Sequence, residues 1–346
     1  FGVTRLERRG RYAATFVETA PSDEPRRRLP AHLDVTVVAV LPLVVAVVVL
    51  LWRPWAPTLD MAMTELRVRD VGGGHTPLIG LPGRIGNFPD QGSHPGPLSF
   101  YLIAPFYRLA GASAWGMELG SVVVNAVAIG CTIAIGARLA GGRGGVALAA
   151  LCACAVRGYG LDVLTHPWNP YFPVLLWLLV LVAAWAVVAG DHWAAVVVVV
   201  AGSVAAQTHV PYLLNGLAIS ALVYGVMLRR WVRSRDELRP LLVSLAVGAL
   251  LWFPAVVDQL VRDPGNIRML YRHFAADPPE AAIGTGEAVR VFFRHLDAFS
   301  MAGDLVLRRS AFVYRSGLPD GTGWGGVAVF ALWIAVAAVA ARQHHR

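Results

Sequence analysis

The chain has 346 residues, of which 56% are hydrophobic and only 15% are charged. This balance leaves too little polar surface for a soluble domain, so it excludes an ordinary soluble enzyme and indicates an integral membrane protein. The net charge is +8, but we expect no nucleic-acid partner, because the arginines stand beside apolar segments, where basic residues orient a membrane protein.

The predicted elements begin after a polar, arginine-rich stretch, residues 1–30, which we expect to be a disordered cytoplasmic tail. A membrane-spanning helix needs about 20 mostly apolar residues. Eight segments approach or reach that length: 34–52, 117–138, 144–158, 171–189, 192–208, 211–228, 240–257 and 324–341. The predicted fold is therefore an all-α polytopic membrane protein of about eight transmembrane helices. Residues 31–346 form a single helical domain, and two long polar loops, 53–97 and 258–322, are expected to be external.

Arginine placement predicts the orientation, because arginine-rich loops stay in the cytoplasm. The four most basic segments are residues 26–28, 138–145, 229–239 and 342–346. With eight crossings, all four lie on the cytoplasmic side, together with both termini. A further crossing at the apolar run 98–113 would move every later basic segment to the outer side of the membrane. We therefore interpret this run as an interfacial or re-entrant helix against the outer leaflet.

The first external loop carries three acids, Asp60, Glu65 and Asp70. On a helix, residues five apart are separated by about 140°, so neighbouring acids would not share a proton. They suit separate roles, such as a general base and a ligand for a divalent ion or a substrate. The alternative is a solvated loop whose acids offset Arg67 and Arg69.

Histidines recur beside prolines at the predicted outer ends of helices, at His94, His166 and His209. Their separations have no local metal-ligand spacing, so we do not favour a zinc site. Asn169 and Gln207 accompany them, and polar groups at membrane depth are costly and often functional. Trp168 alone is typical of an aromatic belt at the membrane interface.

A family resemblance rests on the order of several segments. They are Asp60 and Glu65 after the first apolar segment, "HPGPLSFYLIAPFYRLAG", "HPWNP", "QTHVPY", and "FPAVVDQL" followed by "DPGN". This order resembles the GT-C superfamily of polytopic glycosyltransferases, in the branch of protein mannosyltransferases and aminoarabinose transferases (glycosyltransferase family 39-like). The resemblance covers roughly residues 34–275. The chain departs from the pattern because it lacks the common adjacent Asp-Glu pair, which leaves the roles of Glu65 and Asp70 open.

The resemblance implies transfer of a sugar from a polyprenyl-phosphate donor to a hydroxyl of a glycan, lipid or protein acceptor. The reaction would occur at the outer face of the cell membrane. Asp60 matches the general base, with Glu65 as the second catalytic candidate. The candidate substrate-binding residues are Asp70, His75, Arg84, His94, His166, Asn169, Gln207, His209, Tyr212, Asp258 and Gln259. A divalent cation, Mg²⁺ or Mn²⁺, is a possible cofactor, held by Asp60, Glu65 or Asp70.

Two other functions fit the sequence less well. A transporter or a flippase of lipid-linked sugars places polar residues near the bilayer midplane, often within internal repeats. Here the polar residues collect at one predicted face, and no convincing repeat is present. A non-catalytic assembly protein predicts that Asp60, Glu65 and His94 do not converge in space.

Overall fold

The computed structural model describes residues 31–86, 91–234, 238–277, 281–307 and 322–344, so the expected tail at 1–30 lies outside the described residues. The described chain is nearly all α-helical. The helices are α1 (Ala31–Leu50), α2 (Leu59–Asp70), α3 (Leu98–Leu109), α4 (Ala114–Tyr159), α5 (Leu161–Leu164), α6 (Val174–Ala189), α7 (Ala194–Thr208), α8 (Pro211–Ser234), α9 (Leu238–Val261), α10 (Asn266–Ala275), α11 (Thr285–His295), α12 (Ala298–Leu307) and α13 (Trp324–His344). Two short strands, β1 (Pro82–Ile85) and β2 (Gly92–Ser93), pair antiparallel.

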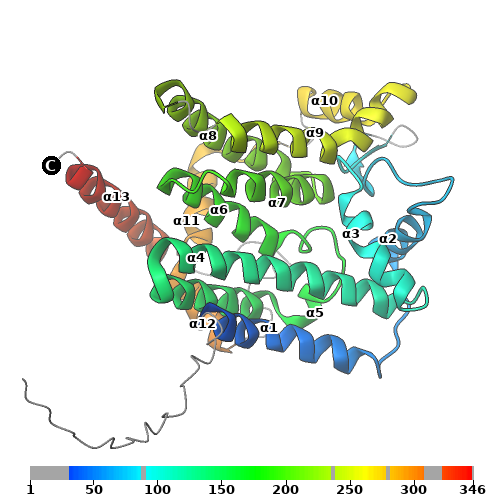
Figure 1. The fold of residues 1–346 in the computed structure, drawn as a ribbon, viewed down its shortest axis with the longest axis horizontal. Helices are drawn as coiled ribbons and strands as arrows, with labels where there is room; N and C mark the ends of the chain where they lie inside the picture. Colours follow the sequence, from blue (N-terminus) through cyan, green and yellow to red (C-terminus); the bar gives the residue numbers. More distant parts are fainter. Residues whose placement is uncertain (1–30, 87–90, 235–237, 278–280, 308–321, 345–346) are drawn as a thin grey trace, which may run out of the picture.

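All eight predicted apolar segments are helical, which confirms the predicted helix positions. Helix α4 holds two of these segments, because its backbone reverses at Ala140 and Gly141, where Gly141 has φ 65° and ψ −163°. The two halves approach so closely that a Cβ on Gly144 would clash with the carbonyl oxygen of Gly136. Glycine therefore permits the tight bend that turns one long helix into an antiparallel pair, as Figure 1 shows.

The number of membrane crossings is supported only in part. Among the described residues, four helices are long and apolar enough to span a bilayer, namely α1, α4, α8 and α9, while α6, α7 and the part of α13 over Trp324–Ala340 are apolar but shorter. Outward-facing side chains on α1, α8 and α9 are large and apolar, for example Val38 at 69% and Leu250 at 72% exposure. Such surfaces belong in hydrocarbon, so the fold is that of a membrane protein.

The helical bundle has two distinct ends. At one end, the bend of α4 meets the turn between α6 and α7 through an ion pair of 3.1 Å between Arg138 and Asp191. Arg230 of α8 donates a hydrogen bond to the Val188 carbonyl nearby. We call this the arginine end. At the other end, the indole of Trp115 at the start of α4 donates to the Val47 carbonyl near the end of α1.

The segment between α1 and α4 packs over this second end, which we call the Asp60 end. It contains α2, the two strands and α3, on the right of Figure 1. The run 98–113 forms α3, a 12-residue helix that is too short to span a bilayer. Close packing on α4 explains the position of α3. A Cβ on Gly116 or Gly120 of α4 would lie closer to the backbone of α3 than ordinary van der Waals contact allows. The structure therefore agrees with a non-spanning helix at this place.

The last helices leave the Asp60 end. Helix α10 stays there, because its first residue, Asn266, exchanges hydrogen bonds with the backbone of Ser93. Helices α11 and α12 contact α13, and Figure 1 shows them toward the other end of the bundle. Of the described residues in the polar segment 258–322, those of α10 are therefore the part built into the Asp60 end.

Candidate functional site

Asp60 lies in the first turn of α2, half-buried, and is held by a residue distant in the sequence. The indole Nε1–H of Trp168 donates a hydrogen bond of 3.2 Å to Asp60 Oδ2. A carboxylate in the first turn of a helix is also stabilised by the helix dipole. Trp168 therefore does more than form an aromatic belt, since it fixes the carboxylate predicted to be the base. The second oxygen, Oδ1, is left available for another partner.

His94 is buried beside this carboxylate. The backbone N–H of Val210 donates to His94 Nδ1 at 3.2 Å, and the Asn169 side-chain amide lies 2.8 Å from His94 Nε2. Because Nδ1 accepts, the neutral ring carries its proton on Nε2. Asn169 must then accept through its amide oxygen, which is otherwise buried without a partner. The two amide atoms are nearly alike in shape, so this exchange costs no packing.

The field of Asp60 reaches both histidines of this cluster. Burial lowers the pKa of His94 to about 4, helped by nearby His209 and opposed by Asp60. Burial likewise lowers the pKa of His209, again opposed by Asp60. The two imidazole rings lie 5.0 Å apart, centroid to centroid. Asp60, His94 and His209 therefore converge, with both histidines neutral at pH 7.

Tight loop packing holds this cluster in place. The N–H of Gly96 donates to the Gln207 carbonyl at 3.2 Å, and a Cβ on Gly96 would lie 2.1 Å from Gln207 Oε1. The Gln207 amide donates to the Leu251 carbonyl of α9. Tyr212, in the first turn of α8, donates a long hydrogen bond of 3.4 Å to the Pro170 carbonyl. Gln207 thus connects the loop of Gly96 to α9, and Tyr212 connects α8 to the loop of Pro170.

Glu65 does not join Asp60. It accepts hydrogen bonds from Tyr107 of α3 at 2.9 Å and from Arg69 at 3.3 Å. Burial raises the pKa of the Tyr107 hydroxyl, which keeps it a donor. Asp70 ends the helix, where its backbone carbonyl accepts from Gly73. The three acids share α2 as predicted, but Asp60 and Glu65 contact different side chains.

The remaining predicted residues have mixed placements. Asp258 is buried, and its two oxygens contact Arg262 Nε and the N–H of Asn266. Gln259 accepts from the N–H of Arg268. Both therefore bind the start of α10. His75 is exposed and lines a cavity of about 410 Å³ together with Arg67 and Arg262. Arg84 lies exposed on β1.

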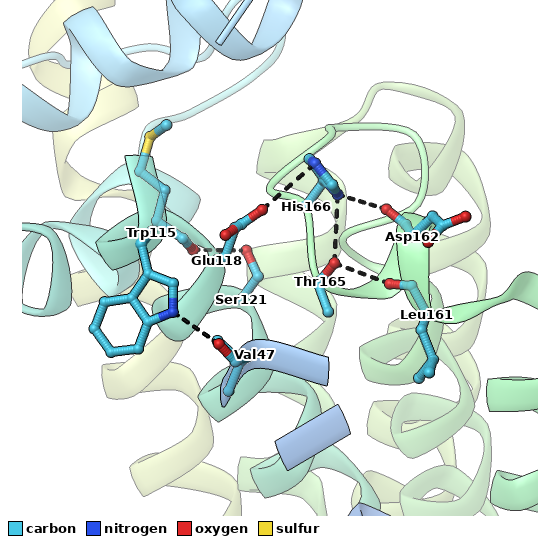
Figure 2. Close-up of polar contacts among 9 residues, drawn as sticks. Val47, Trp115, Glu118, Ser121, Leu161, Asp162, Thr165 and His166 are labelled. Atoms are coloured by element: carbon cyan, nitrogen blue, oxygen red, sulfur yellow. Dashed lines mark hydrogen bonds and ion pairs between the residues drawn. The ribbon is translucent and has the colours of Figure 1, made fainter. Parts of the chain in front are cut away.

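His166 lies in the same loop as Trp168, and it leads to a residue that the sequence analysis missed. Its Nε2 is 3.6 Å from a carboxylate oxygen of Glu118, which is completely buried on α4. Figure 2 shows the pair between α4 and the loop after α5. Glu118 stands at the start of a predicted spanning segment. A lone acid in an apolar run was the available signal for it.

A large apolar groove runs between α1 and the second half of α4, with a volume of about 840 Å³. Its walls are mostly small apolar side chains: Val35, Val38, Ala39, Pro42, Val146, Ala149, Ala150, Ala153 and Val156. Val156 follows Val146 by ten positions, which is about 15 Å along the helix. Arg157 and Asp162 lie where the groove meets the Asp60 end. The groove thus joins an apolar wall to a polar end.

The acids predicted as ligands of a divalent ion have separate surroundings. Glu65 is engaged by Tyr107 and Arg69, away from Asp60. Within the described ranges, no group of three or more His, Cys, Asp or Glu side chains is placed to hold a metal ion.

Comparison with protein-family models, curated proteins and solved structures finds no match to this chain.

Proposed function

We propose that this chain is a membrane glycosyltransferase. It would move a hexosyl or pentosyl group from a polyprenyl-phosphate donor to an acceptor hydroxyl. The observation that carries the proposal is the convergence of Asp60, Trp168, His94 and His209 at one end of an apolar bundle. The resemblance to GT-C enzymes supplies the reaction type.

Asp60 is the proposed general base. It accepts the proton of the acceptor hydroxyl while the hydroxyl oxygen forms a bond to the anomeric carbon of the sugar. The bond from that carbon to the phosphate oxygen breaks, and its electron pair leaves with the polyprenyl phosphate. Trp168 holds Oδ2 of Asp60, so Oδ1 is the atom that takes the proton. A positioned base of this kind contributes about 10²- to 10⁴-fold in rate.

A neutral histidine suits a sugar site. His209 keeps a low pKa through burial, so it offers a hydrogen bond to a sugar hydroxyl without a competing positive charge beside the base. Both ring nitrogens of His94 are engaged by Val210 and Asn169, so His94 holds the surrounding loops in place. Two arginines, Arg67 and Arg262, line the cavity that also contains His75. Their guanidinium groups suit the leaving phosphate, where negative charge develops in the transition state.

The apolar groove between α1 and α4 suits the lipid chain of the donor. Its length along the helices allows a prenyl chain to remain in hydrocarbon, while its polar end at Arg157 and Asp162 opens toward the Asp60 end. A bilayer-embedded bundle with the reaction at its interface keeps lipid and sugar each in a favourable solvent. In this proposal the Asp60 end faces outward from the cell membrane, and both termini are cytoplasmic.

The test of catalysis compares two substitutions on one helix. Asp60→Asn keeps the shape and removes the base, so transfer from polyprenyl-phosphate sugars by purified protein in lipid should fall about 10²-fold or more. Asp70→Asn, at the other end of α2, is the matched control and should stay within about threefold of the parent. Parent-level transfer by Asp60→Asn would remove Asp60 as the base.

The orientation is tested with two matched glycine positions. A Cβ on Gly74, at the Asp60 end, or on Gly142, at the bend of α4, meets no heavy atom within 4 Å. Each is replaced by Cys after removal of the native thiols at Cys131, Cys152 and Cys154. An impermeant thiol reagent added to intact cells should label Gly74→Cys and spare Gly142→Cys. Equal labelling of both would contradict the orientation.

A flippase of lipid-linked sugars is the second candidate, and the same groove favours it, since the groove follows α1 and α4 along the bundle. A flippase would move a fluorescent polyprenyl-phosphate sugar between leaflets of a vesicle without cleaving it. In that case Asp60→Asn would leave lipid movement unchanged and no sugar product would form. Release or transfer of sugar favours the enzyme.

A further inference from the structure

Glu118 is the most unusual polar group in the described chain. Its side chain is 0% exposed, and neither carboxylate oxygen has a hydrogen-bond donor. The indole N–H of Trp55 lies close to the same carboxyl group without meeting hydrogen-bond geometry. Burying an unpaired carboxylate in this way costs far more than burying the neutral acid.

The hydrogen bonds of His166, whose imidazole faces Glu118, identify which ring nitrogen carries a hydrogen. His166 Nδ1 lies within hydrogen-bond distance of the Asp162 carbonyl, which can only accept, so Nδ1 carries the hydrogen of the neutral ring. Thr165 agrees with this tautomer, because its hydroxyl donates to the Leu161 carbonyl and can only accept from Nδ1. Nε2 therefore has a lone pair and no hydrogen, and Figure 2 shows this nitrogen directed at the Glu118 carboxyl group.

Two acceptors facing each other require one proton between them. Nε2 of His166 and Oε1 of Glu118 lie 3.6 Å apart, slightly beyond hydrogen-bond distance. A small rotation of either side chain closes the gap once Glu118 carries a proton. The ring of Trp55 packs on His166 with centroids 4.8 Å apart and limits how far the imidazole can turn away.

Few other charges reach this pair. Asp162 acts on His166 through its field as well as its carbonyl. Asp34 of α1 lies near the opposite end of that helix, about 20 Å along the axis from Val47. The guanidinium of Arg108, on α3, lies next to Gly72. Helix α6, which also packs on α4, carries no titratable side chain.

We propose that Glu118 is a positioning residue that holds one proton and donates it to Nε2 of His166. This contact ties the loop after α5 to α4. The same loop carries Trp168, which holds Asp60, and Asn169, which contacts His94. Loss of the proton from Glu118 leaves two facing acceptors, so the loop loses its hold on the Asp60 cluster.

The first test needs no enzymatic activity. Infrared spectra of the purified protein in lipid at pH 7 should contain the C=O stretching band of a buried carboxylic acid. Glu118→Gln should remove that band, whereas Asp60→Asn and Glu287→Gln, an exposed acid on α11, should leave it. A band that survives Glu118→Gln, or no such band in the parent protein, would overturn the proposal.

The second test rests on the proposed glycosyl transfer. Glu118→Gln keeps an N–H donor toward Nε2, so transfer at neutral pH should stay within about threefold of the parent. In the parent, transfer should fall at alkaline pH as Glu118 loses its proton. This fall should be absent in Glu118→Gln, which cannot ionise. Glu118→Met has similar volume but no donor, so transfer should fall roughly tenfold to a hundredfold through misplacement of the base. Equal defects in the two variants would contradict a donor role. If the infrared result holds but no variant transfers sugar, the proposed function alone fails.

Discussion

His94 gives the sharpest stability prediction, because its burial has a calculable cost in acid. Its folded pKa is about 4, against an ordinary value of 6.5. Above pH 6.5 the imidazole is neutral in both the folded and unfolded states, so it contributes no pH dependence. Between pH 6.5 and 4 only the unfolded state gains the proton. The free energy of unfolding therefore falls with pH by about 3 kcal/mol in total.

The measurement compares the parent protein with His94→Gln, which keeps a polar side chain but cannot titrate. Unfolding by a denaturing detergent is followed at several pH values from 8 to 4. Both proteins lose stability as carboxylates and other histidines become protonated, and the difference between them isolates His94. The parent should lose about 3 kcal/mol more than the variant, with parallel curves above pH 7. Parallel curves down to pH 4 would refute the buried, neutral His94.

Three further substitutions test the packing of the site. Gly96→Ala places a Cβ 2.1 Å from Gln207 Oε1, so it should destabilise the protein by about 1–3 kcal/mol in the same unfolding assay. Tyr107→Phe removes a hydrogen bond to Glu65 and should cost about 1 kcal/mol of stability while transfer stays near the parent rate. Trp168→Phe removes the N–H that orients the proposed base and should lower transfer by about tenfold with an unchanged melting temperature. Unaltered transfer in this last variant would show that the indole does not position the base.

The helices could be predicted from the sequence because hydrophobic length is a strong signal. Each predicted apolar segment is a helix, and the run 98–113 forms the short α3. The bend at Gly141 was implied by two apolar segments separated only by "LAGGR". The number of crossings is harder to predict, since α6 and α7 are apolar but only 16 and 15 residues long. Length alone does not decide whether such helices reach both surfaces.

The contacts within the site could be predicted only in part. The sequence indicated that His94, Asn169 and His209 lie near one another, because all stand at helix ends on one predicted side. It could not indicate that Trp168 rather than Glu65 holds Asp60. That choice depends on how α2 rotates against α3, which is decided by tertiary packing. Neither spacing nor composition contains this information.

Glu118 escaped prediction for a related reason. An acid near the end of an apolar segment reads as a boundary residue that reaches water, and only the packed structure shows that it is buried. The loop bearing His166 covers it. The pair of a buried acid and a facing histidine therefore forms only when two segments 48 positions apart in the sequence pack together.

The Asp60 cluster does not depend on how many helices cross the bilayer. Its members stand at or just beyond helix ends: Asp60 at the start of α2, His94 before α3, and His209 after α7. Their contacts are made by loops that join at one end of the bundle, so they survive if α6 and α7 stop short of the opposite surface. Orientation is a separate matter. If thiol labelling found the Asp60 end in the cytoplasm, the base and its histidines would keep their geometry, and the donor would have to present its sugar from the inner leaflet.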